Sequence, residues 1–523
     1  MTPFQAEVLA KLKGECRVYL VGGAVRDEIL GVPIKDVDVV TSMPKEALIE
    51  LLTSWGYVPH LIGAQHQTVS LFRDGARMDF LDLTGSIEDD ALRRDFSINA
   101  IYKDLSSGEL IDPQNGLQDM KFKTLKACGL ANDRFREDPV RILRMVRFAV
   151  KYKLELDSDT WQSAVNNLPK LSEVASERTT EELGRILVLD DIENAVKMLD
   201  ELGYWREYLP ELARLKGLIQ NKYHAKDAWD HTLHVVKNTP NALLIRLAAL
   251  FHDLGKWETA SKECKVWGQL KVSGQKTTVN EFSLTGKGLN RYNGQYVDVL
   301  GARLDHYPNI IQVKRIRKNY SQASGFEWVV DGKRHFLGHE KESGKLTRQI
   351  LGRYRWSMFL DPPGKGSEKQ LVWLVEQHMN GTLTFMQELR GEGTSFSIKN
   401  KAKQYAWDAG WDGREFNSQR VQNLLYLWEA DFFGGKQREE GDAERFHRVK
   451  SEIFSAAEWL DQNWRNPDWG QFEPFALEKG LQGESFGRFK DHLRTSVLLK
   501  GLDLRDRGSL ENEFEKFVQG KQL

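Results

Sequence analysis

The sequence predicts an α+β fold in which short strands gather near the N-terminus and helices dominate the remainder. Between residues 18 and 83, short apolar or alternating runs are bounded by glycine and proline, which is typical of strands. Residues 138–153 and 345–523 instead carry apolar residues at helical spacing. A chain of 523 residues is long enough for three or four domains.

The first strand and helix come from residues 18–30. The apolar run Val18–Val21 predicts a strand that ends at the pair Gly22 and Gly23. Residues 24–30 then predict a short helix, which Gly31 and Pro33 terminate. Because glycine lets backbone N–H groups approach a ligand closely, this turn is a candidate phosphate cradle.

The second strand carries two carboxylates. Residues 36–40 read DVDVV, so Asp36 and Asp38 point to the same side. Neighbouring carboxylates repel one another unless a cation lies between them, and Mg²⁺ prefers such oxygen ligands together with substrate phosphates. The order strand, glycine pair, helix, DxD therefore predicts a phosphate cradle that faces a magnesium site.

Composition excludes several classes of protein. Hydrophobic residues make up 41% and charged residues 28%, as in soluble globular proteins. We expect no membrane association, because no apolar run reaches spanning length and residues 1–18 lack a signal-peptide core. Three scattered cysteines predict reduced thiols in the cytoplasm, and a net charge of −1 means that nucleic-acid binding depends on local patches.

The next elements extend the sheet. A helix is expected over residues 44–55, with strands over 58–62, 68–72 and 77–83. Asp79 in the last of these is placed to supply a third catalytic carboxylate, although an exposed edge aspartate is the alternative. Arg93, Arg94 and Asp95 precede an apolar stretch that reads as helical. Arginine binds phosphate and a nearby aspartate accepts from a ribose hydroxyl, but a salt-bridged helix start explains the triplet equally well.

Residues 121–153 are strongly basic, with ten Lys or Arg against three acids. We expect a helix over 138–153 that Asp138 caps and that has Pro139 at its first position. Arg141, Arg144 and Arg147 recur every three residues and share a face, opposite an apolar one. Beside the acceptor Asp138, these donors are able to imitate a base-pairing partner; a solvated arginine row is the alternative.

Five segments in this order resemble the class II tRNA nucleotidyltransferase (CCA-adding enzyme) and bacterial poly(A) polymerase family. They read YLVGGAVRDEILG, DVDVV, LRRDFSINAI, IDPQNGL and EDPVRILRMVRFAVKY, and they fall within the first 200 residues or so. The resemblance implies a small, polymerase-beta-like nucleotidyltransferase head followed by helical neck, body and tail. It also implies tRNA, ATP and CTP as partners and Mg²⁺ as cofactor.

The resemblance assigns roles to residues of this chain. Asp36 and Asp38 would bind two Mg²⁺ ions, with Asp79 as the further catalytic carboxylate. The remaining residues would bind the nucleotide: Gly22, Gly23 and Arg26 at the triphosphate, Arg94 and Asp95 at phosphate and ribose, Asp138 and Arg141 at the base, and Arg144 and Arg147 in support. The reaction would be attack of an RNA 3′-hydroxyl on the α-phosphate, with pyrophosphate leaving. Residues 177–187, ERTTEELGRIL, resemble the helix that braces the neck.

Two departures bear on the product. Residues 61–72 lack the arginine pair usual in poly(A) polymerases, which favours tRNA 3′-end synthesis. The segment before Arg93 is too short for the flexible loop of many CCA-adding members, and in this family its absence accompanies addition of CC alone. Full CCA addition, CC addition, poly(A) synthesis and an RNA-binding or phosphohydrolase protein with an inactive head all stay open.

The second half resembles an HD phosphohydrolase domain. The segments HAKDAWDHTLHVV and LAALFHDLGK place His231 about twenty residues before His252 and Asp253. His339 is a further candidate ligand, and His378 also matches a histidine of such domains. These imidazole and carboxylate ligands suit a second divalent transition metal. Some tRNA nucleotidyltransferases carry this domain with phosphatase and 2′,3′-cyclic phosphodiesterase activity.

We expect four domains: a head over residues 1–125, a helical neck over 126–215, an HD domain over 216–390 and a helical region over 391–523. The HD domain departs from the family by an insertion at about 258–336, which reads as short strands with turns. Its thirteen Lys or Arg include the run KRIRK at 314–318, near Tyr307, Tyr320 and Trp328. An RNA-contacting insertion is our hypothesis, and a solvated hairpin is the alternative.

Overall fold

The described part of the chain forms two compact units. A computed structural model describes residues 1–523 except 63–67, 84, 219–226, 260–264, 273–274, 284–296, 301–335, 337, 361–362, 392–394, 413–414, 435–439, 465–471, 501 and 520–523. Unit 1 is Met1–Tyr208 and unit 2 is Leu209–Leu523. In the described residues, no helix is both long enough and apolar enough to cross a membrane.

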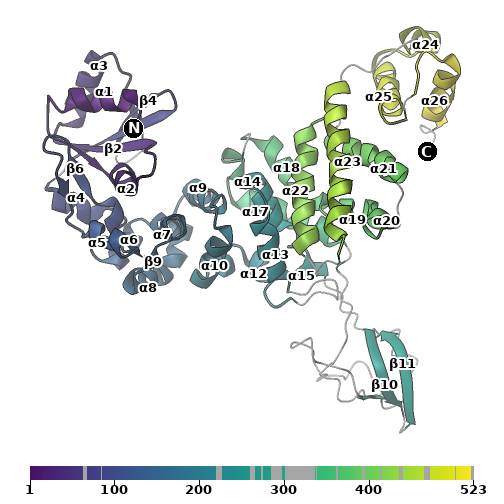
Figure 1. Cartoon of the computed structure of the whole chain (residues 1–523), viewed down its shortest axis with the longest axis horizontal. Helices are drawn as coiled ribbons and strands as arrows, with labels where there is room; N and C mark the ends of the chain where they lie inside the picture. Colours follow the sequence, from purple (N-terminus) through teal and green to yellow (C-terminus); the bar gives the residue numbers. More distant parts are fainter. Residues whose placement is uncertain are drawn as a thin grey trace. The chain divides into compact units, whose positions relative to one another are not determined.

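Unit 1 begins with a seven-stranded sheet in the order β3-β4-β5-β2-β1-β6-β7. Its strands are β1 (Val18–Val21), β2 (Asp36–Thr41), β3 (His60–Ile62), β4 (Thr68–Arg73), β5 (Ala76–Asp82), β6 (Tyr102–Asp104) and β7 (Leu110–Ile111). Figure 1 labels β2, β4 and β6 of this sheet. Strands β2 and β5 are parallel, whereas the other neighbours are antiparallel. The strands expected between residues 18 and 83 are therefore present.

Helices complete unit 1. They are α1 (Pro3–Leu12), α2 (Gly23–Ile29), α3 (Lys45–Ser54), α4 (Ile87–Arg93), α5 (Gly116–Lys121), α6 (Ala131–Glu137), α7 (Val140–Tyr152), α8 (Ser158–Asn167), α9 (Ser176–Leu187), α10 (Ile192–Leu202) and α11 (Tyr204–Tyr208). Two short 3₁₀ helices, η1 (Ser97–Asn99) and η2 (Leu168–Glu173), and the pair β8 (Thr124–Leu125) and β9 (Glu155–Leu156) join them.

The sheet separates two apolar clusters. Val37 and Val39 of β2 and Met78 of β5 pack with buried residues of α1 and α3 on one face. Val40 packs with Ala91 of α4 on the other. Because side chains alternate along a strand, the residue between Val37 and Val39 projects from the opposite face, the one that α4 covers.

Two local predictions were wrong. Arg93, Arg94 and Asp95 do not precede a helix, since α4 ends at Arg93 and the apolar residues that follow form η1 and a buried loop. Ser86 instead starts α4 earlier, through a capping box with Asp89. Asp138 does not cap α7: Pro139 holds that position with no side-chain bond. The Asp138 carboxylate turns to Arg178 instead.

Unit 2 is mainly helical. Its helices are α12 (Pro210–Ala213), α13 (Ala228–Lys237), α14 (Leu243–Phe251), α15 (Lys256–Thr259), α17 (His339–Arg353), α18 (Lys365–Gln377), α19 (Asn380–Thr384), α20 (Met386–Leu389), α21 (Ser395–Gly410), α22 (Ser418–Gly434), α23 (Asp442–Asn463), α24 (Phe472–Glu478), α25 (Gly483–Lys500) and α26 (Arg507–Gln519), with the 3₁₀ helix η5 (Trp356–Met358). A separate apolar cluster joins α24, α25 and α26.

The expected insertion contains strands. Strands β10 (Lys265–Val272), β11 (Gln275–Ser283) and β12 (Val297–Leu300) form an antiparallel sheet in the order β11-β10-β12. Strands β10 and β11 are labelled in Figure 1. The basic run at 314–318 and the aromatic residues Tyr307, Tyr320 and Trp328 lie outside the described residues. Their expected contact with RNA therefore stays a hypothesis.

Candidate functional sites

Three carboxylates lie on one face of the head sheet. Asp38 of β2 pairs in register with Asp79 of the parallel strand β5, and Asp36 lies two residues before Asp38. The valines between them face the α1 and α3 core, so all three aspartates project from the opposite face. The structure thus brings the three predicted carboxylates to the same side of adjacent strands.

The glycine turn lies directly against this site. Gly22 has a φ of 70°, which is costly for residues with a side chain, and a Cβ there would lie 2.7 Å from Asp38 Oδ2. Gly23 begins α2 immediately afterwards. Both the backbone conformation and the space beside Asp38 therefore require glycine at position 22.

The electrostatics of Asp38 favour a bound cation. Burial raises the pKa of its carboxyl, and the charges of Asp79 and Asp36 raise it further, whereas Arg94 and Arg144 oppose the shift. Asp79 already accepts hydrogen bonds from Ser70 Oγ at 2.6 Å and Arg77 Nε at 2.8 Å. A crowded group of ionised carboxylates is stabilised by a divalent cation, so the donor set fits Mg²⁺.

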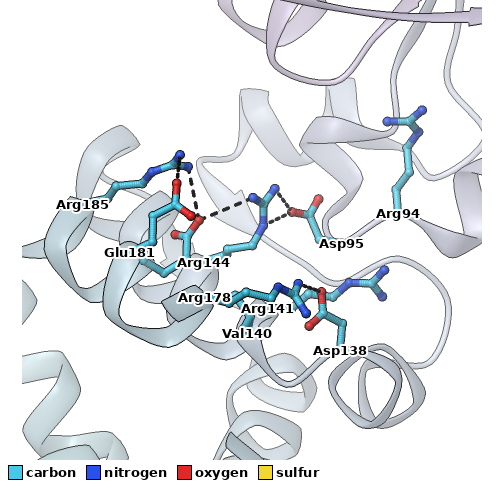
Figure 2. A pocket seen from close by; sticks show the side chains of 10 residues that line it. Arg94, Asp95, Asp138, Val140, Arg141, Arg144, Arg178, Glu181 and Arg185 are labelled. Carbon is cyan, nitrogen blue, oxygen red and sulfur yellow. Dashed lines mark hydrogen bonds and ion pairs between the residues drawn. The ribbon is translucent and has the colours of Figure 1, made fainter. Parts of the chain in front are cut away.

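A pocket of about 420 Å³ adjoins the end of α4 and the helices α7 and α9 (Figure 2). Its lining is highly charged: Arg94, Asp95, Asp138, Val140, Arg141, Arg144, Arg178, Glu181, Glu182 and Arg185. Five arginines face four carboxylates in this set. Such a pocket has the volume of a small-molecule site and donors suited to phosphate oxygens.

Asp95 and Arg144 hold one side of the pocket together. Arg144 donates to Asp95 Oδ2 from Nε at 2.8 Å and from Nη2 at 2.5 Å (Figure 2). Asp95 also accepts from the Phe96 backbone N–H and from Asn99 Nδ2. Burial alone would raise the pKa of Asp95, but Arg144 and these donors lower it to about 2. Asp95, two residues after the end of α4, therefore forms a buried ion pair with Arg144 of α7.

Asp138 has one open acceptor. Its Oδ2 accepts from Arg178 Nη2 at 2.8 Å, while its Oδ1 is buried without a hydrogen-bond partner among the described residues. Arg141 donates to the backbone carbonyl of Arg93 at 2.9 Å and lies 3.5 Å from Glu137. A buried acceptor without a partner is costly unless a ligand donor fills the position.

Arg26 and Arg147 are engaged by the protein itself. Buried Arg26 donates to Asn99 and Asp27, and its guanidinium lies 4.4 Å from the centre of the Tyr152 ring. Arg147 donates to Glu182 at 2.7 Å and stacks on Phe148. Both side chains line contacts between elements of unit 1, and neither lines the described pocket.

Arg94 lies between the pocket and the carboxylates. It forms an ion pair with Asp90 at 3.0 Å and donates to Tyr102 Oη at 2.9 Å. Its charge also opposes the rise that burial causes in the pKa of Asp38. Arg94 thus links the two parts of the candidate site in unit 1.

A second site lies inside unit 2. His231 belongs to α13, His252 and Asp253 follow α14, and His339 begins α17. These four predicted ligands meet, together with His378 after α18 and Asp431 of α22. Two groups have ligand atoms within 4.8 Å of one another: His231, His252 and Asp431, and Asp253, His339 and His378. Among the residues that the structure describes, no other group of three or more such residues brings its ligand atoms within 4.8 Å of one another.

Two of the histidines in this cluster are in the form that binds a metal. Burial lowers the pKa of His378 to about 3 and also lowers that of His339, so both rings are neutral near pH 7. Burial would also lower the pKa of His252, but the adjacent Asp253 carboxylate raises it above its usual value. Burial would raise the pKa of Asp253, but His252 and Lys256 lower it well below its usual range. Neutral imidazoles beside an ionised carboxylate are the forms that ligate a divalent metal.

Comparisons with known proteins find similarity mainly in unit 1. Residues 18–83 and 74–126 match the poly A polymerase head domain, and residues 153–216 match the probable RNA and SrmB-binding site of polymerase A. A multifunctional CCA protein of Herminiimonas arsenicoxydans is 35% identical over 263 residues, and a CCA-adding enzyme of Streptococcus suis is 34% identical over 221. This part of the chain is therefore similar to poly A polymerase head domains and to CCA-adding enzymes.

The similarity covers part of the chain. The match to the Herminiimonas protein spans 46% of this chain and 63% of that protein, and the match to the Streptococcus protein spans 39% and 54%. The chain thus aligns with less than two thirds of these relatives. The structure of a CCA-adding enzyme from Bacillus stearothermophilus in complex with CTP has a TM-score of 0.52 at 18% identity and covers 100% of both chains. That likeness confirms the predicted α+β fold.

Sequence reasoning missed several residues of these sites. Arg178, Glu181, Glu182 and Arg185 line the pocket from α9, which the family resemblance had presented only as a brace. Their helical spacing of three and four residues was the available signal. Asp431 was not expected as a ligand, because nothing in the local sequence WEADFFGG distinguishes it from a solvated helix aspartate.

Proposed function

We propose that the chain is a template-independent RNA nucleotidyltransferase that adds CMP and AMP to tRNA 3′ ends. The observation that carries the proposal is the placement of Asp36, Asp38 and Asp79 on one sheet face, with the glycine turn against Asp38. Arg94 connects these carboxylates to a pocket whose charges suit a nucleoside triphosphate. The similarity of unit 1 to CCA-adding enzymes supports the same reaction.

The reaction divides among the residues of unit 1. Asp36 and Asp38 would hold Mg²⁺, which supplies charge stabilisation of the triphosphate and lowers the pKa of the attacking hydroxyl. The RNA 3′-oxygen bonds to the α-phosphorus, and the bond from that phosphorus to the bridging oxygen breaks, so pyrophosphate leaves. Arg94 orients the phosphates, and backbone N–H groups at Gly22 and Gly23 approach them.

Base selection would use Asp138 and Arg141. The unpartnered Oδ1 of Asp138 accepts from the exocyclic amine, a group that CTP and ATP share. Arg178 holds the other carboxylate oxygen, so the acceptor keeps its direction. UTP and GTP present a carbonyl at the corresponding position and would leave Asp138 without a donor.

Poly(A) synthesis and partial CC addition are the competing products. Only residues 83–86 connect β5 to α4, so the long loop of many CCA-adding members is absent at this position. This supports CC addition as a variant of the same proposal. Incubation of the purified protein with tRNA lacking its 3′ end, and with CTP and ATP singly and together, distinguishes CC, A, CCA and poly(A) by product length. No incorporation under any of these conditions would contradict the transferase proposal.

Replacement of Asp138 tests base selection. We expect Asp138→Ala to lower kcat/KM for CTP by about 10–100-fold, because one specific base contact contributes roughly 1–3 kcal/mol. Misincorporation of UTP should rise relative to CTP. Asp133→Ala, an exposed aspartate of neighbouring α6, is the matched control and should leave both values unchanged. Equal loss for all four nucleotides would instead indicate a structural role for Asp138.

We further propose a metal-dependent phosphohydrolase in unit 2, with phosphatase or 2′,3′-cyclic phosphodiesterase activity on RNA ends. The convergence of His231, His252, Asp253 and His339 favours it. Removal of a terminal phosphate would expose the 3′-hydroxyl that the head requires. Release of phosphate from a 3′-phosphorylated RNA, or opening of a 2′,3′-cyclic phosphate, tests this activity. The absence of both reactions with every divalent metal that is supplied would refute it.

A further inference from the structure

Contacts from Asp90 and Tyr102 fix the side chain of Arg94, the arginine between the carboxylates and the charged pocket. Arg94 Nε donates to Tyr102 Oη at 2.9 Å and to Asp90 Oδ2 at 3.1 Å. Its Nη2 lies 3.0 Å from the same Asp90 oxygen, and its guanidinium lies 5.2 Å from the centre of the Tyr102 ring. The protein therefore occupies one edge of this guanidinium, the edge that carries Nε and Nη2.

Asp90 and Tyr102 are also bonded to each other. Tyr102 Oη donates to Asp90 Oδ2 at 2.5 Å. The tyrosine is fully buried, and burial raises the pKa of its hydroxyl, so the group keeps the proton that it donates. Arg93 Nη2 approaches the other Asp90 oxygen only to 3.6 Å. Asp90 Oδ2 is thus the single atom at which Tyr102 and Arg94 meet.

The partners of Arg94 come from two different elements. Asp90 belongs to α4, and Tyr102 begins β6, which pairs with β1. The backbone leaves α4 at Arg94, where ψ is 165°. An arginine at the end of a helix has many rotamers, and bonds from both a helix and a strand remove most of that freedom. The two partners therefore fix the direction of Arg94 before any ligand binds.

The other edge of Arg94 is available to a ligand. Within the described part of the chain, its hydrogen bonds and ion pairs use Nε and Nη2, so the two hydrogens of Nη1 remain. Arg94 lines the pocket, and in Figure 2 its guanidinium lies apart from the ion pairs that join the other labelled side chains. A fixed guanidinium binds a phosphate oxygen with a smaller loss of side-chain entropy than a mobile one.

We propose that Tyr102 and Asp90 are positioning residues for the triphosphate, and that they act through Arg94. They hold Nε and Nη2, so that Nη1 is presented to a phosphate oxygen of the nucleotide. Neither of them touches the nucleotide. The proposal rests on the proposed nucleotidyl transfer for the identity of the ligand, whereas the contacts that fix Arg94 belong to the structure itself. Loss of the Tyr102 hydroxyl should therefore weaken phosphate binding and leave RNA binding unchanged.

Removal of the Tyr102 hydroxyl tests this proposal. We expect Tyr102→Phe in the full chain to weaken the binding of CTP and of inorganic tripolyphosphate by the same factor, about 3–10-fold, because one hydrogen bond to a charged group is lost and the ring is kept. Tripolyphosphate has no base or ribose, so it reports phosphate contacts alone. The titrations contain Mg²⁺ but no RNA, so no transfer accompanies binding. Affinity for tRNA lacking its 3′ end, measured separately, should stay unchanged.

A double-mutant cycle distinguishes positioning from a structural role. Arg94→Ala should weaken tripolyphosphate binding by itself, and Tyr102→Phe should add little in that background, because the guanidinium through which it acts is missing. Fully additive losses would show that Tyr102 does not act through Arg94 and would overturn the proposal. Tyr19→Phe is the matched control, a buried tyrosine of β1 in the same apolar cluster, and it should leave every affinity unchanged.

Asp90→Asn tests the second positioning residue. The amide keeps the size of the side chain but loses the charge that Arg94 pairs with, so tripolyphosphate should bind about 10-fold more weakly. This loss should also disappear in the Arg94→Ala background. Unchanged binding in both Asp90→Asn and Tyr102→Phe would refute the proposal, as would a wild-type chain that does not bind tripolyphosphate.

The positioning role and the transferase function fail separately. Suppose that tripolyphosphate binds and depends on Tyr102 as expected, but no nucleotide is added to any tRNA. That result would uphold the positioning of Arg94 and refute nucleotidyl transfer. Addition of nucleotides by a chain in which Tyr102→Phe leaves CTP and tripolyphosphate binding unchanged would uphold the transferase function and refute the positioning role.

Discussion

Buried ion pairs and hydrogen bonds between distant segments fix the positions of individual side chains in the candidate sites. Asp95 is the clearest example, because its carboxylate lies in the interior of unit 1 and is bonded by Arg144, Asn99 and the Phe96 backbone. Sequence reasoning assigned it to a ribose hydroxyl. That role stays a prediction, and its bonds also make Asp95 a positioning residue that fixes Arg144 at the edge of the pocket.

The lowered pKa of Asp95 predicts a pH-dependent stability. The pKa falls from 3.8 to about 2 on folding, so the ion pair stabilises unit 1 above pH 4 and the contribution is lost as the pH falls toward 2. We expect Asp95→Asn to destabilise unit 1 by about 2 kcal/mol at pH 7 and by roughly half of that at pH 3. Hydrogen exchange of the α7 amides at both pH values measures this difference.

The control for Asp95 is Asp159→Asn, an exposed aspartate in α8. It should change the exchange of α7 little at either pH, because it has no part in the pocket. A penalty for Asp95→Asn that is equal at pH 7 and pH 3 would show that lost packing, and not the charge, is responsible.

At the scale of elements, close approach of backbones positions both sites. Gly22 admits the turn beside Asp38, and Gly255 does the same for the cluster in unit 2. Gly255 donates its backbone N–H to Ser343 Oγ at 2.8 Å, which ties the end of the HDLGK segment to α17. A Cβ at this position would lie 2.4 Å from the His339 carbonyl oxygen and 2.6 Å from the Ser343 nitrogen.

Gly255→Ala should therefore displace α17 and its ligand His339. Both clashing atoms belong to the backbone, so we expect a loss of about 1–3 kcal/mol in stability together with a lower metal content. Thermal unfolding and elemental analysis measure the two effects. Gly352→Ala in the same helix meets nothing within 4 Å and should be neutral or stabilising, since alanine favours helices. Equal metal content in both variants would refute the role of Gly255.

At the scale of the whole molecule, each unit holds its own candidate site. The carboxylates and the charged pocket belong to Met1–Tyr208, and the histidine cluster belongs to Leu209–Leu523. The match to the poly A polymerase head domain lies in unit 1, whereas the candidate metal ligands of unit 2 come from five segments between residues 231 and 431. The two proposed activities therefore belong to different units of the chain.

Separate sites predict separable activities. Asp36→Ala should lower nucleotide addition by at least about 100-fold, because it removes charge stabilisation of the reacting phosphates. Hydrolysis of a 2′,3′-cyclic phosphate by unit 2 should stay unchanged. Parallel assays of both reactions on the same preparation measure this, with Asp82→Ala at the end of β5 as a control that keeps both. Loss of both activities in Asp36→Ala would refute independent sites.

Local sequence pattern was sufficient for the strands of the head, for the shared face of Asp36 and Asp38, and for the apolar side of α7. Each of these depends on a period of two or 3.6 residues, or on a glycine next to a strand, and short-range sterics determine such features. The family resemblance added the nucleotide residues and the histidine ligands. Pattern failed where a buried loop had the composition of a helix, as after Arg94, and where the Asp138 carboxylate turned from the helix to Arg178.

Only the tertiary structure decided how distant side chains combine. The open acceptor of Asp138, the tie between Asp95 and Arg144, and the arrival of Asp431 beside His231 each join segments far apart in the chain. Helix packing decides which carboxylate reaches a buried cluster. The local periodicity of the sequence does not indicate it. The other ligands of unit 2 likewise come from separate helices and helix ends, so the cluster forms only once those helices are packed.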